Sequence, residues 1–141
     1  MNAAIIDTDV VSMLFKGDSR AQRYRVHISG RLLGISFMTL AELERWPLER
    51  GWGPSRKAEL AHHLTKYTVL PVSREICAKW AEVSWGTRRK GRPIQTADAW
   101  IAACALHYQV PLITNNADDY TMVDDLQVLT RDGSGTSKTE F

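Results

Sequence analysis

The chain has 141 residues, of which 44% are hydrophobic and 24% charged, and its formal net charge is +2. This length suits one compact domain, and the composition excludes disordered and fibrous proteins. The longest apolar run, residues 99–106, is far shorter than the roughly 20 residues that cross a bilayer, and acids interrupt the N-terminal apolar stretch. We therefore expect neither a membrane span nor a signal peptide. Two cysteines, Cys77 and Cys104, cannot form a disulfide framework, which favours a reducing cytoplasm.

Short apolar runs alternate with longer helical patterns along the chain. The strand-like runs are 3–6, 32–35, 69–72, 112–114 and 126–129. The helical patterns are 10–15, 20–28, 39–46, 55–67, 74–89 and 97–108. This alternation predicts an α/β fold with a central, mainly parallel sheet covered by helices on both faces. Residues 131–141 are polar and rich in Gly, Ser and Thr, so we expect one domain over residues 1–130 and a flexible C-terminal tail.

Acidic residues follow several of these strands. Asp7 comes directly after the first strand, Glu42 lies in the helix after the second, and Asp118 and Asp119 follow the fourth. Ligands of parallel sheets bind at the carboxyl ends of the strands, so these acids are expected on one rim. Asp98 is the only charged residue in the apolar stretch 97–106, at the start of a helix that is predicted to be buried.

Each acid also has an ordinary structural explanation. Asp7 can cap the helix that follows it. Glu42 fits a capping box that begins at Thr39. Asp98 can interact with the helix dipole behind a Thr96 cap. Each explanation is adequate alone, but together they require several acids to converge on one rim by accident.

Converging carboxylates indicate a cation. Two charges about 4 Å apart repel by about 4 kcal/mol at an effective dielectric constant of 20, and a divalent cation removes that cost. Oxygen ligands without a Cys/His set suit Mg²⁺ or Mn²⁺ rather than zinc. Such a cation beside a basic surface suits phosphodiester chemistry. The basic run Arg88, Arg89, Lys90 and Arg92 is then either a solvated face or a phosphate contact.

Four motifs occur in a fixed order: IIDTDV at 5–10, SFMTLAEL at 36–43, RKGRPIQTADAWIAA at 89–103 and LITNNADDY at 112–120. In order and spacing, they resemble the PIN domain family, and within it the VapC-type ribonuclease toxins of type II toxin–antitoxin pairs. The resemblance implies a three-layer Rossmann-like fold and a Mg²⁺- or Mn²⁺-dependent endoribonuclease that cleaves RNA, with transfer RNA as one candidate. It also implies a small antitoxin partner, and a homodimer or toxin–antitoxin hetero-oligomer.

The resemblance assigns a role to each motif residue. Asp7 and Asp98 are the implied metal ligands, and Glu42 and Asp119 complete the implied catalytic set. Asp119 is favoured over Asp118 because it directly precedes an aromatic residue. The auxiliary residues are Thr8, Asp9 and Asn116, and the residues expected to bind RNA are Arg88, Arg89, Lys90 and Arg92. Asp9 departs from the family, which usually has asparagine there.

Two other functions remain open from the residues. The motif at 5–10 is also similar to the first motif of haloacid-dehalogenase-like phosphatases, in which Asp7 would be the nucleophile and Asp9 the acid/base. Alternatively, the chain is a non-catalytic PIN module that binds RNA or an antitoxin. Trp46 and Trp52 flank a loop broken by Pro and Gly, where they are candidate anchors for an antitoxin or a second copy, with base stacking as the less supported reading.

Overall fold

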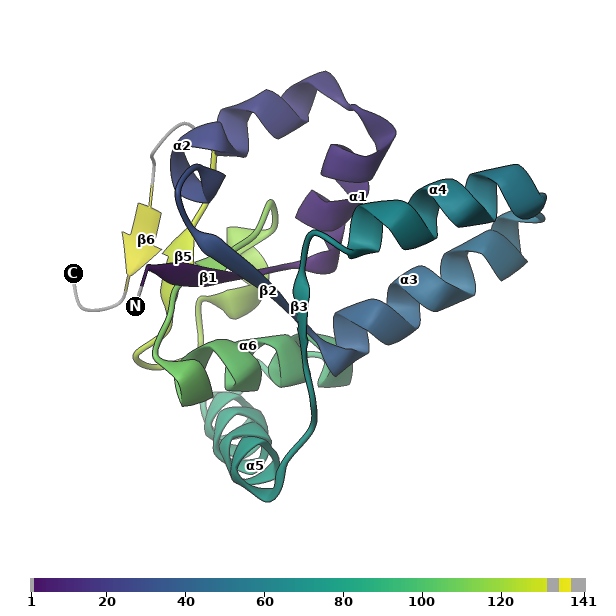
Figure 1. The fold of residues 1–141 in the computed structure, drawn as a ribbon. Coiled ribbons are helices and arrows are strands. Elements are labelled where there is room, and N and C mark those ends of the chain that lie inside the picture. The colour runs from purple at the N-terminus through teal and green to yellow at the C-terminus, as the bar shows by residue number, and fades with distance from the viewer. Residues whose placement is uncertain (1, 132–134, 138–141) are drawn as a thin grey trace.

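A computed structural model describes residues 2–131 and 135–137. A sheet of order β3-β2-β1-β4-β5-β6 forms its centre (Figure 1). Its strands are β1 (Ala3–Ile6), β2 (Leu32–Ser36), β3 (Thr68–Leu70), β4 (Leu112–Ile113), β5 (Gln127–Leu129) and β6 (Gly135–Ser137). Strands β1 to β5 pair in parallel, whereas β6 is antiparallel to β5. The predicted mainly parallel sheet is therefore confirmed.

Helices cover both faces of this sheet (Figure 1). They are α1 (Thr8–Lys16), the 3₁₀ helix η1 (Ser19–Tyr24), α2 (Arg25–Ile28), α3 (Phe37–Arg50), α4 (Pro54–Leu64), α5 (Arg74–Arg89), α6 (Thr96–Tyr108) and the 3₁₀ helix η2 (Ala117–Tyr120). Successive side chains of β1 point to opposite faces of the sheet, so they belong to two separate parts of the hydrophobic core. Ile5 belongs to the cluster formed with α5 and α6, whereas Ala4 and Ile6 belong to the cluster formed with α1 and η1. The three predicted layers follow from this alternation.

Helices α3 and α4 form a hairpin that projects past the carboxyl ends of the strands (Figure 1). The turn depends on Gly51, which ends α3 with a left-handed φ of 62° and donates its backbone N–H to the Pro47 carbonyl. Glycine adopts this conformation without strain. Pro54 then begins α4 in the first turn, where a missing N–H costs nothing.

The segment predicted as one helix over 20–28 is a 3₁₀ helix followed by a single α-helical turn. Its buried residues, Ala21, Tyr24 and His27, recur every three positions. That spacing matches the three residues per turn of a 3₁₀ helix, so burial against the sheet selects the tighter form.

The predicted tail, residues 131–141, lies mostly outside the described residues. Within it, residues 135–137 form β6, which the sequence pattern did not predict. In the described part of the chain, no helix is long and apolar enough to cross a membrane.

Candidate active site

Asp7 lies at the carboxyl end of β1 and caps α1, where one carboxylate oxygen accepts a hydrogen bond from the Thr8 backbone N–H (2.8 Å). Its other oxygen accepts two further bonds, from the Thr114 and Tyr120 hydroxyls, each 2.8 Å long. Only 6% of Asp7 is exposed. A carboxylate buried this deeply needs such donors because its desolvation is costly. The capping role is therefore real, but it does not explain two donors from distant parts of the chain.

Glu42 lies in the second turn of α3, not at its start. The helix begins at Phe37 with Ser36 as its N-cap, whose hydroxyl accepts a bond from the Thr39 backbone N–H (3.1 Å). The capping box predicted for Thr39 and Glu42 is therefore wrong, because the helix starts earlier than its apolar pattern indicated. Glu42 instead accepts a bond from the Thr8 hydroxyl (2.7 Å), which joins α3 to the start of α1.

Asp98 is partly buried in the first turn of α6. The N-cap is Gln95, which makes no side-chain capping bond, so the Thr96 cap is also wrong. The Tyr120 hydroxyl lies 3.4 Å from an Asp98 carboxylate oxygen and is also bonded to Asp7. Tyr120 therefore links the two acids that the family resemblance assigns to the metal.

Asp9 is held by the segment that follows β4. One of its oxygens accepts a bond from the Val10 N–H (2.7 Å). The other accepts bonds from the Asn115 N–H (3.1 Å) and the Asn116 side-chain amide (2.9 Å). The auxiliary residues Asp9 and Asn116 are thus in direct contact, and Asp9 ties the ends of β1 and β4 together.

A hollow of about 190 Å³ opens beside Asp98. Asp118 and Asp119 of η2 line it, together with Arg92. The Arg92 guanidinium donates to the Thr121 hydroxyl (3.2 Å) and to the Asp118 carbonyl (3.5 Å). Both η2 acids are exposed, and the Asp119 charge is one of those that raise the pKa of Asp98. Asp119 is thereby connected electrostatically to the buried acids.

Burial and mutual repulsion raise the pKa of three carboxyl groups. The pKa of Asp98 rises to about 6, chiefly through burial and then through the charges of Asp7 and Asp119. The pKa of Asp9 rises to about 7 through burial and the Asp7 charge. Burial also raises the pKa of Asp7, against the lowering effect of its three donors, and Glu42 adds to the rise. These acids therefore act on one another as one electrostatic site.

We expect this site to make the cation-free protein less stable as pH rises. The folded-state pKa values of Asp9 and Asp98, about 7 and about 6, lie above the ordinary value of 3.8. Between about pH 4 and pH 7 the folded state binds more protons than the unfolded state, so the free energy of unfolding falls as pH increases. After allowance for solvent screening, the loss should be about 1–2 kcal/mol, or about 4–8 °C in the melting temperature.

Thermal unfolding in chelator from pH 4.5 to 7.5 measures this slope. The double variant Asp9→Asn/Asp98→Asn should show a flatter profile, because neither side chain titrates. A wild-type melting temperature that rises across this pH range would contradict the assignment.

The donor set at this rim suits a hard divalent cation, because it consists of carboxylate oxygens. Among residues 2–131 and 135–137, however, no three Asp, Glu, His or Cys side chains already form a metal-ligand set. Hydroxyl groups hold the acids instead: Thr8 is bonded to Glu42, and Tyr120 to Asp7. The residues thus fit a cation by their chemistry and their mutual repulsion, and Asp7 and Asp98 are those that could hold it.

The sequence interpretation missed the hydroxyl residues Thr114 and Tyr120. Thr114 ends a predicted strand, and Tyr120 follows the two η2 acids, so both lie at the rim where ligands were expected. A search for hydroxyl residues beside the rim acids would have selected them. Tyr120 is only 2% exposed, which also fits an ordinary core aromatic, and its long-range bond to Asp7 has no signature in the local pattern.

The four predicted RNA-binding cations are divided between different environments. Arg88 and Arg89 are exposed at the end of α5. Lys90 donates to the Asp124 carboxylate (2.6 Å) and to a backbone carbonyl (2.8 Å), so its charge is paired. Of the four, Arg92 is the one that lines the hollow beside the acids.

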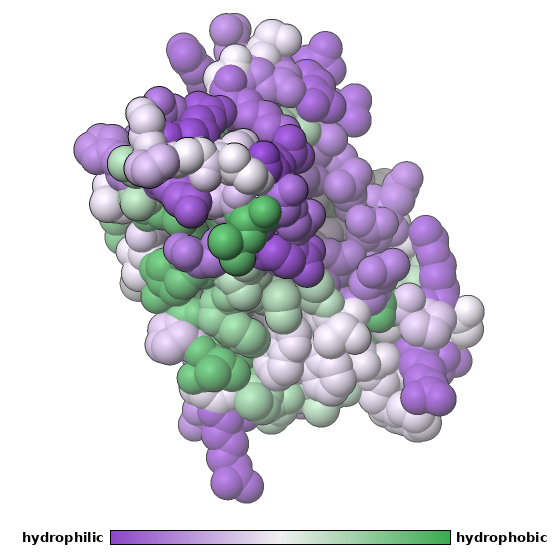
Figure 2. Space-filling model, turned by 90° about the vertical axis from the view of Figure 1, so that its right-hand side faces the viewer, coloured by the Kyte–Doolittle hydropathy of each residue, from purple (hydrophilic) through white to green (hydrophobic). Residues whose placement is uncertain are grey.

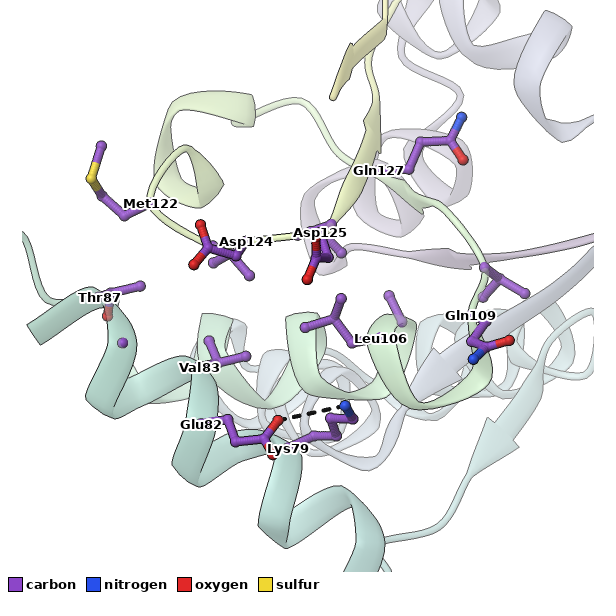
Figure 3. Close-up of a pocket in the computed structure, with 15 residues that line it drawn as sticks. Lys79, Glu82, Val83, Thr87, Leu106, Gln109, Met122, Asp124, Asp125 and Gln127 are labelled. Atoms are coloured by element: carbon purple, nitrogen blue, oxygen red, sulfur yellow. Dashed lines mark ion pairs between the residues drawn. The ribbon is translucent and has the colours of Figure 1, made fainter. Parts of the chain in front are cut away.

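A larger hollow, of about 530 Å³, lies between α5, α6 and the segment after η2 (Figure 3). Lys79 and Glu82 form an ion pair (3.5 Å) on its α5 wall, and Asp124 and Asp125 line it from the opposite segment (Figure 3). None of the acids predicted for catalysis lines this hollow. It is therefore separate from the acidic rim.

Comparison with known proteins agrees with this architecture. The curated relative Ribonuclease VapC1 of Haemophilus influenzae (strain R2866) is 28% identical over 129 residues, covering 87% of this chain and 93% of the relative. The solved VapBC-1 structure from nontypeable H. influenzae has a TM-score of 0.77 and 26% identity, covering 91% of this chain and 97% of that one. VapBC-5 from Mycobacterium tuberculosis is a member of the VapBC family of toxin–antitoxin systems. Its structure has a TM-score of 0.68 and 27% identity, and the match covers 93% of this chain and 98% of that one.

The family model described as "PIN domain" matches residues 4–125, which span all but the first residue of β1 and every element from α1 to η2. The matched region includes all of the rim acids. On this match, and on the fold and the rim together, the chain belongs to the PIN domain family.

Proposed function

We propose that this chain is a metal-dependent endoribonuclease and the toxin of a type II toxin–antitoxin pair. The observation that carries the proposal is the meeting of acids from four separate elements at one rim: Asp7 after β1, Glu42 on α3, Asp98 on α6 and Asp119 on η2. The negative charges of these acids repel one another, and a bound Mg²⁺ or Mn²⁺ would offset that repulsion. The similarity to proteins named Ribonuclease VapC and to VapBC structures supports RNA as the substrate.

Each residue of the rim has its own role in the proposed cleavage of RNA. A divalent cation, when bound, lowers the pKa of water and offsets charge on the scissile phosphate. Asp7 and Asp98 would hold that cation. Glu42, oriented by the Thr8 hydroxyl, accepts a proton from the attacking water. Arg92, which lines the hollow beside Asp98, contacts the phosphate backbone.

The burial of Asp7 argues against the phosphatase alternative. An aspartyl nucleophile must expose one carboxylate oxygen to its substrate. Both Asp7 oxygens already accept hydrogen bonds, from the Thr8 N–H on one side and from two hydroxyls on the other. With 6% exposure, this carboxylate is suited to ligation, which needs only a remaining lone pair, rather than to in-line attack.

We also propose a protein partner, and action in the cytoplasm, where cellular RNA is available. The α3 helix carries Leu48, which is 74% exposed, on the projecting hairpin. Figure 2 views the side toward which this hairpin projects and shows apolar surface beneath a polar upper part. Exposed apolar surface of this kind is typical of interaction sites. A small antitoxin protein, in a hetero-oligomer that also contains a homodimer of this chain, is the proposed occupant.

We expect the purified chain to cleave RNA only in the presence of Mg²⁺ or Mn²⁺. Cellular RNA and purified transfer RNA are incubated with the protein and either cation or chelator, and the new 5′ ends are mapped. Discrete ends that disappear in chelator support the proposal. Intact RNA under all conditions would favour the non-catalytic PIN module, and cation-independent ends would exclude the proposed chemistry.

A further inference from the structure

A cluster of aromatic rings lies where α1, α3 and α4 meet. We define it by four residues: Phe15, Trp46, Trp52 and His63. The Phe15 ring centroid lies 6.4 Å from that of Trp46, 5.9 Å from that of Trp52 and 5.5 Å from that of His63. The two tryptophan rings are 5.5 Å apart. Both tryptophans are partly buried in this cluster, and their role as anchors for a partner stays a prediction.

Three cations lie over the faces of these rings. The Lys16 ammonium and the Arg50 guanidinium are 4.8 Å and 4.9 Å from the Trp46 centroid. The Arg56 guanidinium is 4.4 Å from the Phe15 centroid and 5.0 Å from that of Trp52. Each distance lies within the roughly 6 Å at which a cation is attracted to a ring face. The aromatic cluster thus gathers three like charges on one small surface.

These charges are only partly neutralised. Arg56 pairs with Glu59 (2.7 Å), and Lys16 lowers the pKa of Asp18, whose carboxylate is already bonded to a neighbouring arginine. Neither Lys16 nor Arg50 forms an ion pair within residues 2–131 and 135–137, and both are exposed. The surface therefore carries unpaired positive charge.

Two helices lead from the acidic rim to this surface. At the rim, Thr8 of α1 is bonded to Glu42 of α3. Phe15 lies seven residues after Thr8, and Trp46 four residues after Glu42, so each lies on the same helical face as its rim residue. At 1.5 Å per residue, these steps are about 11 Å along α1 and about 6 Å along α3. A single nucleic-acid strand covers such distances within a few nucleotides.

We propose that Lys16, Arg50 and Arg56 bind backbone phosphates of single-stranded RNA next to the scissile phosphate. This proposal rests on the proposed ribonuclease function and extends it to the path of the strand. Positive charge beside an acidic, cation-binding rim matches a strand whose scissile phosphate lies at the rim and whose neighbouring phosphates lie over the cations. A guanidinium that lies over a ring face leaves edge N–H groups available for phosphate, and Arg56 keeps some of them although its Nη1 donates to Glu59.

The geometry points to phosphate contact rather than base stacking. The cations already lie over ring faces of Phe15, Trp46 and Trp52, the surfaces on which bases would stack. The three cations should therefore position the strand without reading its sequence. Their loss should weaken binding of all single-stranded RNA sequences to a similar extent.

Salt-dependent RNA binding tests the proposal. The double variant Lys16→Gln/Arg50→Gln is prepared in the Asp98→Asn chain, so that labelled single-stranded RNA stays intact. Each phosphate contact on a single strand contributes about 0.7 to the slope of log K against log salt, so the double variant should lose about 1.4 of that slope. The matched control, Arg45→Gln, removes an arginine on the same helix that pairs with Glu49 and should keep the slope. If the double variant has a much lower melting temperature, the single variant Arg50→Gln is used instead and should lose half as much of the slope.

Cleavage kinetics separate this proposal from the ribonuclease function itself. In the chain with native Asp98, the double variant should raise KM and keep kcat on a long RNA. It should match the parent on an RNA trimmed close to the cleavage site. An unchanged slope and KM in a chain that does cleave RNA would overturn the phosphate path, as would loss of antitoxin binding with RNA binding intact. If the parent chain cleaves no RNA at all, the proposed ribonuclease function is wrong. The salt dependence of RNA binding then still tests whether Lys16 and Arg50 contact phosphates.

Discussion

Replacement of Asp98 by asparagine should lower the rate of RNA cleavage by orders of magnitude and, in the same protein, raise the stability of the cation-free fold. The substitution keeps the size of the side chain and removes a carboxylate whose pKa is raised to about 6 by burial and by Asp7 and Asp119. Asp98 is proposed to hold a cation that would supply several kcal/mol of charge stabilisation, so its loss corresponds to a decrease in rate of about 10²- to 10⁴-fold. Relief of the repulsion should raise the melting temperature at pH 7.5 by a few degrees.

The opposite directions of the two effects make the experiment informative. A variant that had merely lost its fold would lose activity and stability together. Asp125→Asn, an exposed aspartate that lines the separate, larger hollow, serves as the matched control and should keep both values. Full cleavage by Asp98→Asn would refute the ligand role, and a lower melting temperature would show that Asp98 stabilises the fold instead.

Elements with strong local signals were predictable from the sequence. Strand β1 is an apolar run that ends at a charged residue, and helix α5 starts directly after Ser73, which caps it through a bond to the Ile76 N–H (3.2 Å). The observed bounds of both agree with the prediction. The 20–28 segment was mispredicted because its helix type depends on burial of every third residue against the sheet, which is a tertiary effect. Strand β6 pairs antiparallel with β5, the strand directly before it, and its short Gly-Thr-Ser run has no apolar pattern that would predict a strand.

The acidic rim was predictable for a topological reason. Parallel strands deliver the residues after their carboxyl ends to one edge, so the positions of Asp7 and Asp119 followed from the strand pattern. What holds the acids could not be predicted. The bond from Tyr120 to Asp7 joins residues 113 positions apart, and the aromatic cluster combines residues of three helices. Such contacts depend on packing and leave no periodicity in the chain.

Replacement of Tyr120 by phenylalanine should weaken binding of Mn²⁺ by about 10- to 100-fold, the effect typical of losing a residue that orients a metal ligand. The hydroxyl donates to Asp7 and lies 3.4 Å from an Asp98 oxygen, so it fixes one carboxylate with respect to the other. Phenylalanine keeps the ring, which is 2% exposed, and removes only this donor. Titration of Mn²⁺ followed by electron paramagnetic resonance measures the affinity independently of cleavage.

The stability of the Tyr120→Phe variant should fall while its fold is kept. A hydrogen bond to a charged group contributes about 1.5–3 kcal/mol, and the Thr114 hydroxyl remains as a second donor to the same Asp7 oxygen, so a loss near the lower value is expected. Tyr67→Phe is the matched control, because Tyr67 is also a buried tyrosine whose hydroxyl is bonded, to His63, away from the acids. It should change stability without changing the affinity for Mn²⁺.

A combined variant separates positioning from stabilisation. Thr114→Val removes the other hydroxyl donor to Asp7. Within the described part of the chain this hydroxyl forms no hydrogen bond with Asp98, although it also accepts one from the Asn116 N–H (3.0 Å). If Tyr120 acts by fixing Asp7 with respect to Asp98, Thr114→Val should lower stability with a smaller loss of Mn²⁺ affinity than Tyr120→Phe. Equal losses of affinity would mean that Mn²⁺ binding depends on the number of donors to Asp7 and not on the link that Tyr120 forms between Asp7 and Asp98. An unchanged affinity in Tyr120→Phe would remove Tyr120 from the site and leave it as a core residue.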